Sequence, residues 1–159
     1  MRPIHGLAAA ATAALVLAAG CKDTAPVTRV EGEPAGGTKA TITIYASPTC
    51  GCCHEYIPYL QDHGYVVQEV ATDDVNSVKL DLRVPESDWS CHTAVVDGYV
   101  IEGHVPIEAI DKLLAERPSI DGIALPGMPP GSPGMDGAKE GPFVVVSFSD
   151  GVTEEFLTI

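Results

Sequence analysis

The sequence predicts an α/β domain in which a mixed sheet is flanked by helices and followed by an added C-terminal β-hairpin. Three patterns indicate this class. The alternation in residues 40–46 is typical of a strand, whereas apolar residues in segment 52–63 recur at helical spacing. Asp-Gly, a dipeptide that favours tight hairpin turns, lies between apolar runs twice, at residues 97–98 and 150–151.

The first half of the domain is expected to run strand, helix, strand, helix, over residues 40–46, 52–63, 65–71 and 73–82. Asp73 and Asp74 can cap the second of these helices, because a carboxylate accepts hydrogen bonds from free amides at a helix start. Pro58 lies inside the first helix. A proline there removes a backbone donor, so it marks a point where this helix can bend.

The second half begins with a hairpin whose strands are expected at 93–96 and 99–103. A helix follows, which begins at Pro106 and ends before Pro118. The order strand, helix, strand, helix, hairpin, helix is that of a thioredoxin-like domain. The remaining chain is expected to form a loop rich in Pro, Gly and Met and then the closing hairpin, over residues 118–142 and 143–159.

The first 20 residues are expected to be a lipoprotein signal peptide and not part of the fold. Their apolar run, residues 7–19, is too short to span a membrane as a helix, which needs about 20 residues. Residues 17–21 read Leu-Ala-Ala-Gly-Cys and resemble a bacterial lipobox, in which Cys21 is lipidated and becomes the mature N-terminus. The alternative is ordinary secretory cleavage nearby. Lys22 after this cysteine favours a periplasm-facing lipoprotein anchored in the outer membrane.

Composition narrows the partners that this chain can have. The chain has nine Lys and Arg residues and 22 Asp and Glu residues, which gives a net charge of −13. The protein is therefore not expected to bind nucleic acid.

Residues 21–38 are rich in Pro and Gly and predict a flexible tether, so the domain spans residues 39–159. A lipid on Cys21 would be the only attachment to a membrane.

Three thiols and an imidazole follow the first strand within five positions, in Cys50-Gly51-Cys52-Cys53-His54. Adjacent thiolates crowd negative charge together, which a soft metal stabilises or a disulfide relieves. The partial positive charge of a helix N-terminus also favours thiolates at this position. The cluster therefore predicts a site and not a part of the core.

The expected topology brings distant residues to this cluster. The first hairpin strand runs antiparallel to the leading strand, so Cys91 and His92, which precede it, start at the same sheet edge. The second hairpin strand returns to that edge and is followed by His104. The predicted metal ligands are Cys50, Cys52, Cys53, Cys91 and His104, with His54, His92, Met128 and Met135 as further candidates.

Four motifs together resemble a bacterial envelope family long described as a domain of unknown function, which includes copper-resistance proteins of the CopG type. They are residues 47–54, 90–94, 98–106 and 125–135. The resemblance implies a thioredoxin-like fold, cysteine-rich copper binding and a role in copper tolerance. Copper ions, and envelope proteins that handle copper, are the partners it implies.

Soft thiolates favour Cu(I), and zinc is a weaker candidate because it also binds Cys and His. Thiol–disulfide exchange is the alternative function, with Cys50 as the attacking thiolate and Cys53 as its partner. Cys52 between them offers a competing partner, so a binding protein is favoured over an enzyme. The two functions can coexist in copper-linked redox cycling. A third reading is a structural envelope lipoprotein in which the cysteines form only disulfides.

Overall fold

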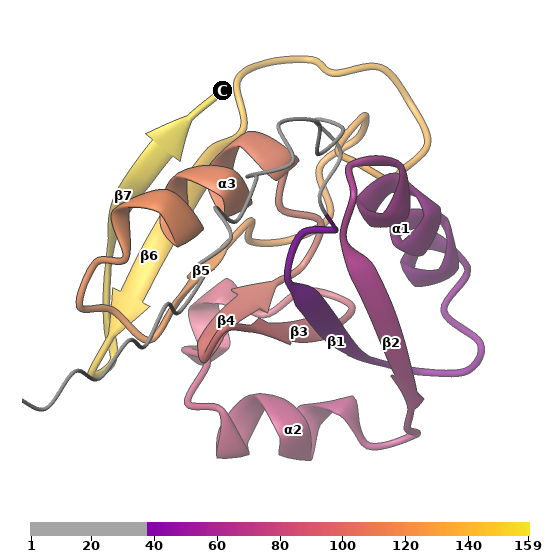
Figure 1. The fold of residues 1–159 in the computed structure, drawn as a ribbon, viewed down its shortest axis with the longest axis horizontal. Coiled ribbons are helices and arrows are strands. Elements are labelled where there is room, and N and C mark those ends of the chain that lie inside the picture. The colour runs from indigo at the N-terminus through magenta and orange to yellow at the C-terminus, as the bar shows by residue number, and fades with distance from the viewer. Residues whose placement is uncertain (1–37) are drawn as a thin grey trace, which may run out of the picture. The chain divides into compact units, whose positions relative to one another are not determined.

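The computed structural model describes residues 38–159, which form a seven-stranded mixed sheet and three α-helices (Figure 1). The strands lie in the order β2-β1-β3-β4-β5-β6-β7. The expected signal peptide, the lipidation site Cys21 and the tether up to residue 37 lie outside the described residues. Among residues 38–159, no helix has both the length and the apolar character needed to cross a membrane.

Strand β1 (Thr41–Ala46) lies inside the sheet, and its alternating pattern follows from that position. Ile42, Ile44 and Ala46 point into the core, whereas the residues between them are more exposed. Strand β2 (Val66–Ala71) pairs with β1 in parallel and forms one edge of the sheet, which leaves most of its side chains exposed.

The hairpin of β3 (Thr93–Val96) and β4 (Tyr99–Glu102) continues the sheet on the other side of β1. β3 runs antiparallel to β1, and Tyr45 pairs with Thr93. In an antiparallel pair, the end of one strand lies beside the start of the other. The residues after β1 and the residues before β3 therefore lie together at one edge of the sheet. This is the arrangement that the sequence predicted for the cysteines.

Helices α1 (Gly51–Asp62) and α3 (Ile107–Glu116) lie on one side of the sheet, and α2 (Val75–Asp81) lies on the other (Figure 1). A short 3-10 turn, η1 (Glu86–Asp88), precedes the hairpin. Side chains of α1 and α3, among them Tyr56 and Ile110, share the main core with β1 and β3. The first helix runs on through Pro58, and Asp74 caps α2 by accepting from the Ser77 amide, as expected.

Residues 118–142 are not a loop throughout, because they include strand β5 (Gly122–Ala124). β5 pairs in parallel with β4 and antiparallel with β6 (Val144–Ser149), which forms the closing hairpin with β7 (Val152–Thr158). All three residues of β5 are buried, so the segment lacks the alternation that marks a strand. This strand joins the C-terminal hairpin to the central sheet.

The α/β class, the mixed sheet with flanking helices and the added C-terminal hairpin are confirmed. The thioredoxin-like assignment stays a prediction.

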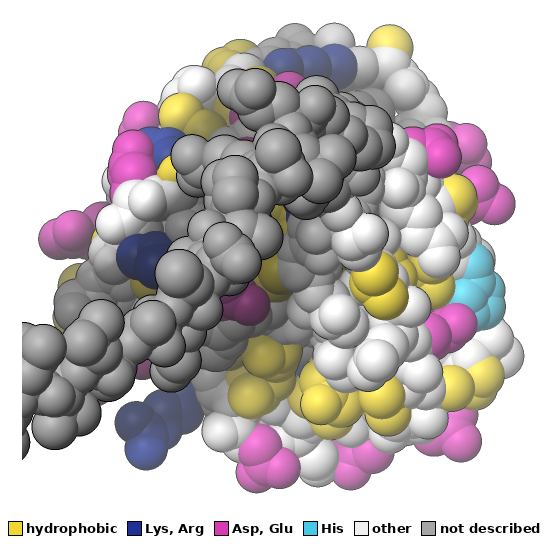
Figure 2. Space-filling view, viewed as in Figure 1, with side chains coloured by type: hydrophobic (Ala, Val, Ile, Leu, Met, Phe, Trp, Pro, Cys, Tyr) yellow, Lys and Arg dark blue, Asp and Glu magenta, His cyan; other side chains and the backbone are white. Residues whose placement is uncertain are grey.

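Figure 2 shows acidic side chains scattered around the margin of the visible face and not gathered in one patch.

Gly122 offers a test of the β4–β5 junction. A Cβ atom there would overlap the Val100 carbonyl and lie 2.7 Å from Cζ of Phe148, so Gly122→Ala should lower the free energy of unfolding by about 1–3 kcal/mol or more. The matched control is Gly141→Ala, where a Cβ atom meets nothing within 4 Å; its effect should stay within about 1 kcal/mol. Denaturant unfolding measures both, and equal stability of the two variants would contradict this packing.

Candidate metal centre

The cysteine cluster is built by the turn that joins β1 to α1. The Cys50 amide donates to the Ser47 carbonyl at 3.0 Å, and Cys50 is the N-cap residue of α1. Cys52 and Cys53 therefore lie in the first turn of the helix. Cys53 is buried, whereas Cys50 and Cys52 are half-buried.

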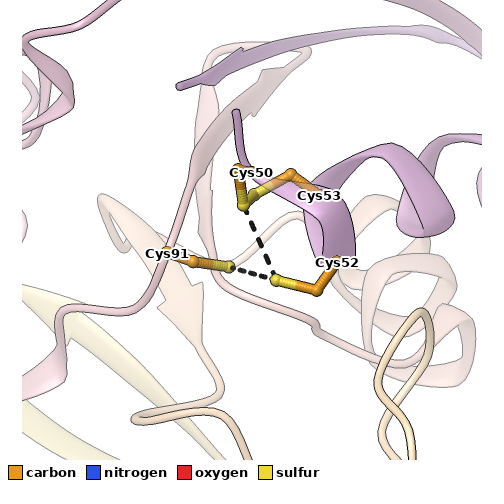
Figure 3. Close-up of side chains that lie close together, drawn as sticks. All are labelled: Cys50, Cys52, Cys53 and Cys91. Atoms are coloured by element: carbon orange, nitrogen blue, oxygen red, sulfur yellow. Dashed lines mark hydrogen bonds between the residues drawn. A yellow bond between two sulfur atoms is a disulfide. The ribbon is translucent and has the colours of Figure 1, made fainter. Parts of the chain in front are cut away.

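Four sulfur atoms meet at this point (Figure 3). Cys50 and Cys53 form a disulfide, and Cys52 and Cys91 are free thiols. The Cys52 sulfur lies 3.6 Å from that of Cys50 and 3.7 Å from that of Cys91, which comes from the segment before β3. All four sulfurs lie within 4.8 Å of one another. The predicted convergence of these cysteines is thus present in the fold.

A second group of ligand atoms adjoins the first and shares Cys91 with it. Nε2 of His104 lies 3.0 Å from the Cys91 sulfur, and Nδ1 of His92 lies 3.3 Å from it. The atoms of these three residues also lie within 4.8 Å of one another. Cys91 therefore belongs to a group of four sulfurs and to a group with two imidazoles.

His104 is oriented by the loop that follows β5. Its Nδ1 lies 2.6 Å from the carbonyl oxygen of Pro133, an acceptor only, so Nδ1 carries the proton and donates. Nε2 then has a lone pair directed at Cys91. Burial lowers the pKa of His104, and the hydrogen bond to Pro133 opposes this shift. A neutral imidazole, held through its other nitrogen by a carbonyl, is the form in which histidine binds metals.

His92 is completely buried, and its ring packs against the rings of Tyr56 and His104. The ring of Tyr56 lies 5.0 Å from the His92 ring and 5.2 Å from the His104 ring, measured between centroids. Burial, then the neighbouring His104, and then Lys79 lower the pKa of His92 well below its ordinary value. Nε2 of His92 has no hydrogen-bond partner among the described residues. The other ring nitrogen, Nδ1, faces the Cys91 sulfur, and a neutral imidazole beside a thiol fits a metal-binding group.

Cys91 is a protonated thiol in the metal-free protein. Burial, then the charge of Cys52, and then the hydrogen bond with it raise the pKa of Cys91 to about 12. Only the thiolate binds a metal, so binding must displace this proton. The thiol has an acceptor close by, since Nε2 of His104 faces it.

Comparisons with known proteins identify the family of this chain. Residues 88–135 match the family described as "Protein of unknown function, DUF411". A solved structure described as copper resistance protein CopG, form 2, is 39% identical, with a TM-score of 0.70, over 76% of this chain and 98% of that chain. Form 1 is 40% identical, with a TM-score of 0.69, over 75% of this chain and 96% of that chain. The chain belongs to the CopG-type copper-resistance family. A search of curated proteins found no match.

The family resemblance inferred from the sequence motifs is thereby confirmed, but not every candidate ligand lies in the two groups. Nε2 of His54 lies 3.2 Å from a carboxylate oxygen of Glu69 on the exposed β2 edge, outside both groups. It faces away because a helix places successive side chains about 100° apart. Met128 is 51% exposed and is not among the residues that line the cavity beside Cys52.

Met135 lies nearer to the site. It lines a cavity of about 360 Å³ together with Cys52, Glu55 and Asp136. The loop is held against α1 at Gly134, where a Cβ atom would lie 2.8 Å from the Tyr56 amide nitrogen. Met135 thus lines the same cavity as the free thiol of Cys52.

Sequence reasoning missed a buried ion pair behind the site. Lys79 on α2 and Glu102 at the end of β4 are 2% and 0% exposed, and their charged atoms lie 2.5 Å apart. Burial raises the pKa of Glu102, while Lys79, Thr93 and the Ser90 amide oppose this shift. A glutamate within the apolar run Val100-Ile101-Glu102 was the only signal in the sequence.

The neutral buried histidines predict acid sensitivity of the metal-free protein. Below pH of about 6.5, unfolded His92 binds a proton that the folded form does not, so stability falls with acidification at up to about 1.4 kcal/mol per pH unit. His92→Gln should reduce this slope, and the difference between the two slopes is the contribution of His92. Denaturant unfolding across pH 5–7.5 measures it. Equal slopes would contradict a histidine kept neutral by burial.

Proposed function

We propose that this protein holds Cu(I) in copper resistance, through Cys50, Cys52, Cys53 and Cys91 together with His104 and His92. One observation carries the proposal: Cys91 belongs both to the four-sulfur group and to the Cys-His-His group. The relatives named copper resistance proteins support copper as the ion.

The donor set fits a soft metal. Thiolate–metal bonds are about 2.3 Å long, as in zinc sites, so ligands of one ion lie up to about 4.6 Å apart. The separations within each group are close to that range, with 4.8 Å as the upper bound. Thiolates select Cu(I) over harder ions, and a thiolate shared by two groups can bridge neighbouring ions. Zinc would use the same ligands and is the weaker candidate.

The disulfide links copper binding to redox state. An external dithiol can reduce the Cys50–Cys53 disulfide to two thiols by exchange, becoming a disulfide itself, and this completes the four-sulfur group. In the disulfide state, Cys52 and Cys91 are the thiols that remain in the described part of the chain. The reverse exchange, in which an external disulfide oxidises Cys50 and Cys53 and is itself reduced to two thiols, would therefore remove two ligands and favour release of copper.

A second function is favoured by the same disulfide. Cys50 and Cys53, at the N-terminus of α1, are placed for thiol–disulfide exchange with a partner protein. In that case Cys50 would be the attacking thiolate and copper binding would be secondary.

The location is part of the proposal. Residues 1–20 would direct export, and Cys21 would carry the lipid that holds the domain 39–159 in the envelope, facing the periplasm from the outer membrane. The lipid would be the only membrane attachment, and envelope proteins that handle copper would be the partners.

Anaerobic titration of the reduced protein with Cu(I) against a competing chelator tests the copper function. We expect one or more bound ions and loss of free-thiol reactivity. Cys52→Ser should reduce the stoichiometry or weaken binding at least about tenfold, because even changes to the partners of ligands cost about 10–100-fold. His54→Gln, outside both groups, is the control and should bind as the unsubstituted protein does.

Absence of competitive binding, together with a readily reversible Cys50–Cys53 disulfide, would contradict the copper function and leave the thiol oxidoreductase. If Cys52→Ser bound copper unchanged, a centre that uses all four sulfurs would be wrong.

A further inference from the structure

The buried pair Lys79–Glu102 lies directly behind the dipeptide Cys91-His92. One carboxylate oxygen of Glu102 accepts from Nζ of Lys79 at 2.5 Å and from the Ser90 amide at 2.6 Å. The other accepts from the Thr93 hydroxyl at 2.6 Å. Ser90 and Thr93 are the residues on either side of Cys91-His92, so one side chain holds both ends of this dipeptide.

Further contacts tie the same dipeptide to Gly103, the residue directly before the third ligand, His104. The Gly103 amide donates to the His92 carbonyl at 3.1 Å. Gly103 has a φ of +76°, and a Cβ atom there would lie 2.6 Å from Cβ of Ser90. The two backbone segments therefore approach as closely as a glycine permits, next to His104.

A fully buried ion pair is weak evidence for a role in stability. Desolvation of two charges offsets much of their attraction, and apolar residues of similar volume often serve the fold as well. Lys79 also donates to the Thr93 hydroxyl at 2.9 Å, so every polar atom of this network has a partner. A satisfied buried network of this kind fixes a single arrangement of the segments that it joins.

We infer that Glu102, held by Lys79, is a positioning residue that fixes Cys91 and His92 at metal-binding spacing from His104 before the metal binds. This inference rests on the proposed copper function. Glu102 itself lies outside both groups of candidate ligand atoms. Its effect passes through Ser90 and Thr93, in the way that partners of metal ligands set the affinity of a site.

A matched pair of double variants tests the inference. Lys79→Met with Glu102→Gln keeps neutral hydrogen bonds to the Ser90 amide and the Thr93 hydroxyl, whereas Lys79→Met with Glu102→Leu removes them. Both double variants lack the buried charges of Lys79 and Glu102. We expect the Leu variant to bind Cu(I) about 10–100-fold more weakly than the Gln variant. The ultraviolet absorption of the copper–thiolate complex should change in the Leu variant only.

Thermal unfolding of the metal-free proteins establishes that both variants are folded. If the Leu variant does not fold, Thr93→Val and Thr93→Ser are compared in its place. Of these two, only Thr93→Ser keeps a hydroxyl that can donate to Glu102, so Thr93→Val should bind Cu(I) more weakly than Thr93→Ser. Equal Cu(I) affinity and absorption in a folded matched pair would overturn the positioning role and leave the copper function intact. Failure of the unsubstituted protein to bind Cu(I) would instead overturn the copper function, and this inference with it.

Discussion

The antiparallel pairing of β1 with β3 is the contact on which the rest of the site depends. It sets Tyr45 beside Thr93, so the turn after β1 and the segment before β3 meet at one edge of the sheet. Cys50, Cys52 and Cys53 come from the turn and the start of α1, whereas Cys91 comes from a segment about forty residues later. The hairpin return through β4 then adds His104. A slip of one residue in this register would turn Cys91 to the other face.

Crowded sulfur is the second constraint on this molecule. Four thiolates within 4.8 Å of one another repel strongly, and two outcomes relieve the repulsion: a disulfide or a soft cation. The Cys50–Cys53 disulfide represents the first outcome. Burial and the neighbouring Cys52 keep Cys91 protonated, with a pKa of about 12, so in the metal-free protein its proton lies beside Nε2 of His104. In the proposed function, metal binding and redox chemistry would therefore act on the same atoms.

Most elements of the fold could be predicted from local patterns. Alternation identified β1, segment 65–71 was predicted as the strand that became β2, helical spacing identified α1 and α3, and Asp-Gly pairs identified both hairpins. β5 was missed because three fully buried residues carry no periodicity. The cysteines and His104 could be placed because each lies next to a strand end. The roles of Pro133, Tyr56 and the pair Lys79–Glu102 could not, since they arise from contacts between residues distant in the sequence.

X-ray absorption at the copper edge of the reduced, Cu(I)-loaded protein tests the central claim most directly, because it reports the atoms bound to the metal. The account predicts sulfur as the main neighbour, with a smaller imidazole contribution that decreases in His104→Gln. A copper environment of nitrogen and oxygen alone would contradict a thiolate centre at the junction of β1, α1 and β3.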